Sequence, residues 1–305
     1  MYLLVIKQLL TMFLIGVCGF VFAKVFKVEE SQRKFLSKLL LYLVNPCMIL
    51  NSFNKEFDAG KLEQLLFVVA IAFVVHGAMI FTGLLSSKEA VDRLGVAFTN
   101  CGFIGIPLIR GVFGDEGVFF LMGYIVVFNI LIWSYGYSQL SCSANLKKIL
   151  TNPNIIACFI GLLLFCLPFT IPAVIATPLS MVADVNTALS MILIGVLLAN
   201  FDLSEGRKYV FKITKLTILR LIVAGLINIA ILFVVYKLFG NFPNVKMLIF
   251  VVLISSSCPM ATNIPSMACA FGKDSTYASI VVSITSVLCI LTLPALVALA
   301  EVFIK

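Results

Sequence analysis

The sequence predicts an all-α integral membrane protein with ten transmembrane helices, arranged as two inverted repeats of five helices. Of its 305 residues, 62% are hydrophobic and 12% are charged, and the mean hydropathy is +1.14. Soluble domains are about half apolar and about a quarter charged. In addition, two apolar segments are interrupted by asparagine and proline at matching places. The bilayer is therefore the expected solvent of this chain.

Charged clusters and Gly/Pro punctuation divide the chain into apolar segments, most of them close to the roughly 20 residues that cross a bilayer. We expect spans at residues 2–22, 35–53, 62–85, 94–109, 117–140, 154–176, 179–200, 210–236, 245–270 and 275–303. The first contains one early lysine, Lys7, and lacks a small-residue cleavage site, so it is predicted to be a span and not a secretory signal.

No polar stretch is long enough for a soluble domain, so residues 1–305 are predicted to form one membrane transport domain. Residues 1–150 form the first five-span repeat and residues 151–305 the second. Because five is odd, the second repeat enters the membrane upside down relative to the first, as in many secondary transporters. Cys47–Leu50 in span 2 also resembles Ser190–Leu193 in span 7.

The two interruptions run from Asn100 to Pro107 and from Pro259 to Pro265. A helix in lipid must bond its own backbone groups, so a break is tolerated only against protein or a water-filled cavity. Paired breaks in corresponding halves indicate a transporter's substrate site. We therefore predict broken crossing helices in spans 4 and 9; the alternative is that the prolines kink ordinary packed helices.

A broken helix presents free N–H groups and the positive end of its dipole, which suit an anion. Amide and hydroxyl side chains beside the breaks can bind a carboxylate, and the apolar residues between them suit a small organic tail. The predicted substrate-binding residues are Asn100, Cys101, Gly105, Pro107, Thr262, Asn263, Pro265 and Asn45. Asn45 precedes Pro46, a pair that either breaks span 2 beside the substrate or forms a packed kink.

Ionisable residues inside spans are functional candidates by default. His76, the only histidine, either carries a proton coupled to transport or is a neutral residue bonded to a neighbour such as Asn129. Asp184 is either a cavity carboxylate involved in coupling or an acid in the first turn of a helix. Arg220 either attracts anions or extends to the membrane interface.

Basic residues set the predicted orientation in the cell membrane. The loops after spans 1, 3, 5, 7 and 9 hold about twice as many Lys and Arg residues as the opposite side. Such residues favour the cytoplasm, so both termini are predicted to be non-cytoplasmic. The same loops explain the net charge of +8 without a nucleic-acid partner. The nine cysteines are scattered, and no C-x-x-C or Cys/His cluster predicts a disulfide framework, a metal site or a cofactor.

These motifs resemble the auxin efflux carrier family, within the bile-acid/sodium-symporter-like superfamily. The resemblance is carried by Tyr42–Leu50, Asn100–Leu108 with Gly114, Asn152–Ala157, Ile194–Leu198 and Pro259–Pro265. It implies ten spans, a scaffold beside a mobile crossing-helix domain, elevator-like alternating access and a homodimer. Plant relatives export auxin, and bacterial relatives are associated with organic acids such as malate and malonate. Proton and sodium coupling both stay open, although the span-9 break lacks the carboxylate that sodium-coupled relatives use.

The expected function is therefore secondary transport of a small organic anion. An anion channel is the first alternative, because broken helices do not distinguish it from a carrier. A membrane-embedded enzyme is the second, but it would need converging nucleophile, acid and base groups or a metal cluster. No phosphate-binding loop of an ATP-driven pump is present.

Overall fold

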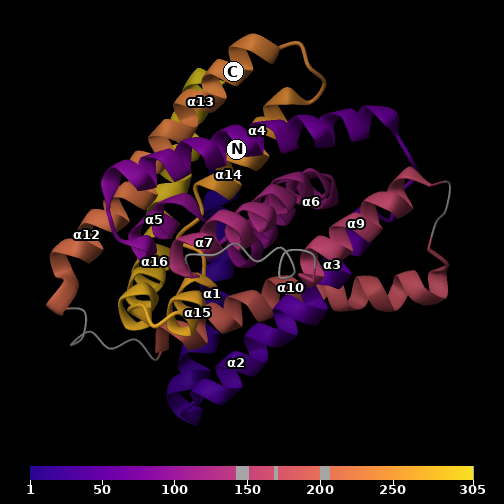
Figure 1. The fold of residues 1–305 in the computed structure, drawn as a ribbon. Coiled ribbons are helices and arrows are strands. Elements are labelled where there is room, and N and C mark those ends of the chain that lie inside the picture. The colour runs from indigo at the N-terminus through magenta and orange to yellow at the C-terminus, as the bar shows by residue number, and fades with distance from the viewer. Residues whose placement is uncertain (142–150, 168–170, 200–206, 305) are drawn as a thin grey trace.

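Helices make up the regular structure of the protein (Figure 1) in a computed structural model that describes residues 1–141, 151–167, 171–199 and 207–304. The α-helices are α1 (Tyr2–Phe26), α2 (Glu30–Leu39), α3 (Asn45–Phe53), α4 (Ala59–Ser86), α5 (Ala90–Ala97), α6 (Ile106–Leu131), α7 (Tyr137–Ser141), α9 (Pro153–Cys166), α10 (Ala173–Ala199), α12 (Val210–Ile218), α13 (Ala224–Phe239), α14 (Val245–Ser256), α15 (Ile264–Ala270) and α16 (Ser275–Phe303). Among the described residues, seven continuous helical stretches are long and apolar enough to cross a membrane. The predicted all-helical, multi-pass architecture is confirmed at this level.

Several transmembrane stretches contain wide π-helical turns. One of them, Leu40–Val44, joins α2 to α3 directly before Pro46, so the helix runs on from Glu30 to Phe53. A wider turn absorbs the hydrogen bond that proline cannot donate. The Asn45–Pro46 pair therefore does not break this span; it alters the pitch of the helix.

Gly114 divides α6 into two rods. Its φ of 65° and ψ of −160° interrupt the helix, and this backbone conformation is readily available only to glycine. The first rod continues from the interruption near Asn100, and the second is the next apolar segment. The sequence separates the two at the same place.

The boundary between the sixth and seventh apolar segments differs from the expected one. The α9 helix ends at Cys166 and α10 begins at Ala173, whereas the sequence predicted spans at 154–176 and 179–200. Leu167 is extended, with φ −92° and ψ 147°, because the residue before a proline is disfavoured in a helix. Pro172 directly precedes α10, and its carbonyl accepts bonds from Ile175 and Ala176.

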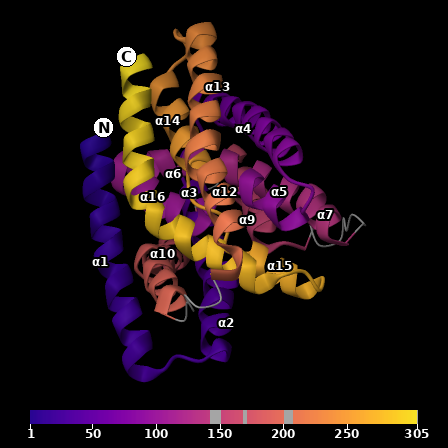
Figure 2. The same cartoon turned by 90° about the vertical axis from the view of Figure 1, so that its left-hand side faces the viewer.

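Four helices, α1, α3, α9 and α10, pack together and are called the scaffold helices here. The contact between α1 and α10 is close: a Cβ built on Gly195 would lie 1.9 Å from the carbonyl oxygen of Gly16. Small residues allow such approaches between membrane helices. Figure 2 shows α1 and α10 on one side of the molecule and α4, α5 and α7 on the other.

The two chain ends lie side by side. The Met1 amino group is 2.8 Å from the Glu301 carboxylate near the end of α16, and Figure 2 shows N and C at the same end of the bundle. That end is called the terminal face below. Because α1 leads away from it and α2–α3 return, the turn after α3 also lies toward this face.

Candidate functional site

Two non-helical segments pair in the protein interior, and together they are called the crossing. The first, Phe98–Asn100, follows α5; the second, Pro259–Ala261, follows α14. They form an antiparallel bridge in which Asn100 N–H donates to Pro259 O at 2.8 Å and Ala261 N–H donates to Phe98 O at 3.1 Å. Both predicted interruptions are therefore real, and they satisfy part of each other's freed backbone.

Arg220 holds the C-terminal ends of two half-helices at the crossing. It lies in the π-helical turn Leu219–Val223, between α12 and α13, and is fully buried. Its guanidinium donates to Val96 O at 2.5 Å, to Cys258 O at 3.1 Å and to Ser256 O. A cation is favourable at helix C-termini, where carbonyl oxygens are left unpaired. The expectation that Arg220 extends to the membrane interface is therefore wrong.

The N-terminal ends of the next half-helices carry the two asparagines. Asn100 caps the π-helical turn Cys101–Gly105, with its Oδ1 accepting from Phe103 N–H at 3.3 Å. Asn263 directly precedes α15. Within the described ranges, Asn100 Nδ2 and Asn263 Oδ1 are buried and have no hydrogen-bond partner. Because leaving such groups unpaired is unfavourable, they are candidates for contact with a ligand.

Cys101 and Gly105 lie where the two interruptions touch. A Cβ built on Gly105 would be 3.4 Å from Cys101 Cβ and 3.6 Å from Cys258 Sγ. Pro107 lies farther on, as the second residue of α6, and its carbonyl accepts from Gln8 Nε2 on α1 at 3.2 Å. The backbone is non-helical at Phe98–Asn100 and helical at Pro107.

Thr262 and Pro265 belong to the second interruption and the helix that follows it. Thr262 is partly exposed between the crossing and α15. Pro265 lies in the first turn of α15, where its missing N–H removes no intrahelical bond. Both residues are thus close in the chain to Asn263 and to the N-terminal end of the half-helix.

Asn45 is part of the scaffold helices and not of the crossing. Its Oδ1 accepts from Asn186 Nδ2 on α10 at 2.7 Å, and both side chains are buried. Phe103, in the helical turn that follows the crossing, packs with Val44 and with Leu193 of α10. Asn45 therefore joins α3 to α10 within the scaffold helices.

His76 is buried in α4 and packs against the crossing. Its ring centroid is 4.7 Å from that of Tyr124 and 6.2 Å from that of Phe98. Its Nδ1 bonds Ala72 O at 2.8 Å, while Asn129 Nδ2 bonds Ile125 O at 2.9 Å. The predicted bond between His76 and Asn129 is absent, because each side chain bonds the carbonyl four residues earlier in its own helix. No partner of His76 Nε2 occurs in the described part of the chain.

Asp184 lies well inside α10 and not in its first turn, because α10 begins earlier than the sequence predicted. Its carboxylate pairs with Arg110 at 2.6 Å, and its side chain is 56% exposed. The contact of Asp184 is with Arg110, so it joins α10 to α6 and not to the crossing.

Three contributions were missed by sequence reasoning. Arg220 was noticed, but its acceptors are main-chain carbonyls, which have no sequence signature. The partner of Asn45 is 141 residues away. Arg110 was not among the predicted site residues, although it follows the end of the predicted fourth span and pairs with Asp115.

Comparison with known proteins gives two findings. The family described as "Membrane transport protein" matches residues 4–145 and 139–297. The uncharacterized transporter MJ1031 of Methanocaldococcus jannaschii is 26% identical over 110 residues, which cover 32% of this chain and 35% of that protein. This match therefore spans about a third of the relative's length.

Proposed function

The chain belongs to this membrane transport protein family, which is auxin efflux carrier-like, and we propose that it is a secondary carrier of small organic anions. Membership of the family makes the protein a membrane transporter. The class of substrate and the mechanism are our proposal, and they rest on the chemistry of the crossing.

The charge of Arg220 carries the proposal. Its guanidinium is buried, and all three of its hydrogen bonds go to neutral carbonyl oxygens. No Asp or Glu in the described residues forms an ion pair with it. An uncompensated cation inside a membrane protein is unfavourable, so an anion that approaches the crossing is attracted to it.

The two half-helix N-termini supply the second attraction. They begin beside Asn100 and Asn263, whose amides have unpaired buried atoms. A carboxylate at this point accepts N–H bonds from helix ends and from Asn100 Nδ2, and it gains from the dipole. Asn263 Oδ1 suits a hydroxyl or a protonated carboxyl group on the same substrate.

We further propose ten membrane crossings, arranged as two inverted repeats in the cell membrane, with both termini outside the cytoplasm. The crossing helices would move against the scaffold helices in an elevator-like step. Support comes from the matching positions of the two interruptions and from the shared position of the chain ends. Phe103 would slide along the apolar surface of Val44 and Leu193.

Sodium-independent transport is the version of coupling that we favour. Backbone carbonyls at broken helices can bind a sodium ion, but here Val96, Ser256 and Cys258 already accept bonds from Arg220. Arg220 then does permanently what a bound cation does transiently at such a site. Proton coupling through His76 stays part of the proposal.

A ligand screen on purified protein tests the substrate class. We expect malonate, malate and related acids to raise the unfolding temperature saturably, because a ligand that binds only the folded state stabilises it by about 2.7 kcal/mol at a concentration 100 times its Kd. The matched amides and methyl esters serve as controls. Equal stabilisation by acids and amides, or none by any acid, would contradict the proposal.

A further inference from the structure

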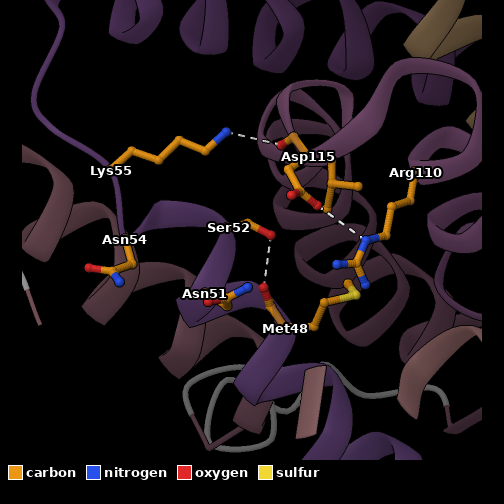
Figure 3. A pocket seen from close by; sticks show the side chains of 8 residues that line it. Met48, Asn51, Ser52, Asn54, Lys55, Arg110 and Asp115 are labelled. Carbon is orange, nitrogen blue, oxygen red and sulfur yellow. Dashed lines mark hydrogen bonds and ion pairs between the residues drawn. The ribbon is translucent and has the colours of Figure 1, made fainter. Parts of the chain in front are cut away.

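A small polar pocket lies between the end of α3 and α6 (Figure 3). Its volume is about 210 Å³. Asn51 and Lys55 line it from α3 and the turn after α3, and Arg110 and Asp115 line it from α6. Drug-sized pockets range from about 300 to 1,000 Å³, so this one suits a small mono- or dicarboxylate better than a bulky aromatic acid.

Arg110 connects α6, the helix that follows the first crossing segment, to the scaffold helix α10 in this pocket. Its Nε lies 3.1 Å from Asp115 Oδ1, within α6, and its Nη2 lies 2.6 Å from Asp184 Oδ1, on α10. The Arg110 side chain is 28% exposed and that of Asp184 is 56% exposed. Exposed ion pairs contribute little to stability, so the link to α10 can open at small cost.

Lys55 brings a second positive charge that lacks a carboxylate partner. Its Nζ donates to the main-chain oxygen of Asp115 at 3.1 Å and lies 5.6 Å from the Phe119 ring centroid. It forms no ion pair with any residue that the structure describes. Burial, followed by repulsion from Lys61, lowers the pKa of the Lys55 amine, against the opposing effect of Asp115 and Glu116. The ammonium is thus undercompensated, and an anion beside it is favoured.

We propose that this pocket is an access site where the transported carboxylate binds Arg110 in place of Asp184, with Lys55 beside it. The exchange replaces one charge-assisted pair by another, so the hydrogen bonds of Arg110 are kept. When Arg110 no longer pairs with Asp184, this link between α6 and α10 is broken. Loading the substrate at the terminal face then frees the crossing helix to move. This inference rests on the proposed transport of carboxylates and adds the place where they first bind.

Two substitutions in one ion pair give the test, because an access site predicts opposite effects for them. In Arg110→Gln the substrate loses its partner, so the concentration for half-maximal exchange from the terminal face rises at least tenfold. In Asp184→Asn the competitor of the substrate is removed, so that concentration falls severalfold. Lys55→Gln raises it. Half-saturation from the opposite face stays unchanged in all three.

The measurement is exchange of labelled malonate in proteoliposomes that contain the full chain in one orientation. The pair Lys212–Glu89 offers a matched control, because its side chains are 34% and 57% exposed and it lies outside the pocket. Lys212→Gln and Glu89→Gln should leave half-saturation unchanged.

If the Arg110–Asp184 ion pair had only a structural role, Arg110→Gln and Asp184→Asn would shift the concentration for half-maximal exchange in the same direction. That result overturns the access site. No shift in either variant overturns it as well. If Arg110→Gln does not fold, Asp184→Asn and Lys55→Gln must still shift in opposite directions. Failure of the unmodified protein to exchange any carboxylate would contradict the transport proposal instead, so the two failures are distinguishable.

Discussion

Arg220 Nη1 lies 2.5 Å from the carbonyl oxygen of Val96, although the two residues are 124 positions apart in the chain. The bond ties span 8 to the last turn of α5, and the other two bonds of the guanidinium tie it to the end of α14 and the residues after it. One side chain therefore orients the C-terminal ends of α5 and α14, while the N-terminal ends of the half-helices that follow the crossing stay available for an anion.

Replacing Arg220 separates its charge from its hydrogen bonds. We expect Arg220→Gln to lose at least tenfold in acid affinity and about 1–3 kcal/mol in unfolding free energy, because buried carbonyls lose their donors. Arg220→Lys should lose similar stability but retain most of the affinity, since the charge remains. Ligand titration and thermal unfolding measure the two effects.

Arg93→Gln is the matched control, because Arg93 also donates to a carbonyl, but its acceptor, Ser87 O, lies before the start of α5 and away from the crossing. Equal loss of acid affinity in Arg93→Gln and Arg220→Gln would show that the charge at the crossing has no special role.

Changing Asn100 to Asp tests the anion site with little change in shape. The cap on the Phe103 N–H is retained, since Asp is as good an N-cap as Asn. The added negative charge repels a carboxylate, so we expect at least a tenfold weaker acid affinity with folding intact. Asn152→Asp makes the same change at the cap of α9, where Asn152 Oδ1 accepts from Asn154 N–H at 2.9 Å, and should leave affinity unchanged. Undiminished affinity in Asn100→Asp would remove Asn100 from the site.

His76→Gln tests proton coupling. Glutamine can keep the bond to Ala72 O but does not titrate near neutral pH. We expect the variant to exchange substrate at the normal rate and to lose accumulation driven by a pH gradient. Preserved accumulation would exclude His76 as the proton carrier, and the crossing alone would then account for transport.

The orientation is tested by cysteine labelling in intact cells, in a background without the exposed native cysteines. Asn241 lies in the turn between α13 and α14, and Lys88 in the turn between α4 and α5; both are exposed. With the termini outside, Asn241→Cys should react with an impermeant thiol reagent and Lys88→Cys should react only after permeabilisation. The reverse pattern would invert the proposed topology.

Sequence reasoning predicted one interruption in each of the two apolar segments, because asparagine and proline are unusual there, and it separated the two rods of α6 near Gly114. It set the bounds of the first interruption too far along the chain. Pro107 was taken as part of the break, but a proline in the first turn of a helix costs no bond, and the chain is non-helical at Phe98–Asn100 instead.

The contacts that define the site could not be predicted from local patterns. The pairing of Thr99 with Met260 joins residues from opposite halves of the chain. Arg220 binds main-chain oxygens, which every residue possesses, so its role depends on where two helices end. Arg110 and Asp184 form an ion pair although they are 74 positions apart in the chain, so no local pattern indicates the contact.

Counterflow tests the central claim most directly. Proteoliposomes filled with unlabelled malonate are diluted into a trace of labelled malonate, and uptake is followed over time. A carrier of small carboxylates predicts a saturable, transient accumulation of label above equilibrium that requires internal malonate and is lost in Asn100→Asp. Uptake that does not saturate and does not depend on internal acid, or no uptake of any small acid, would contradict it.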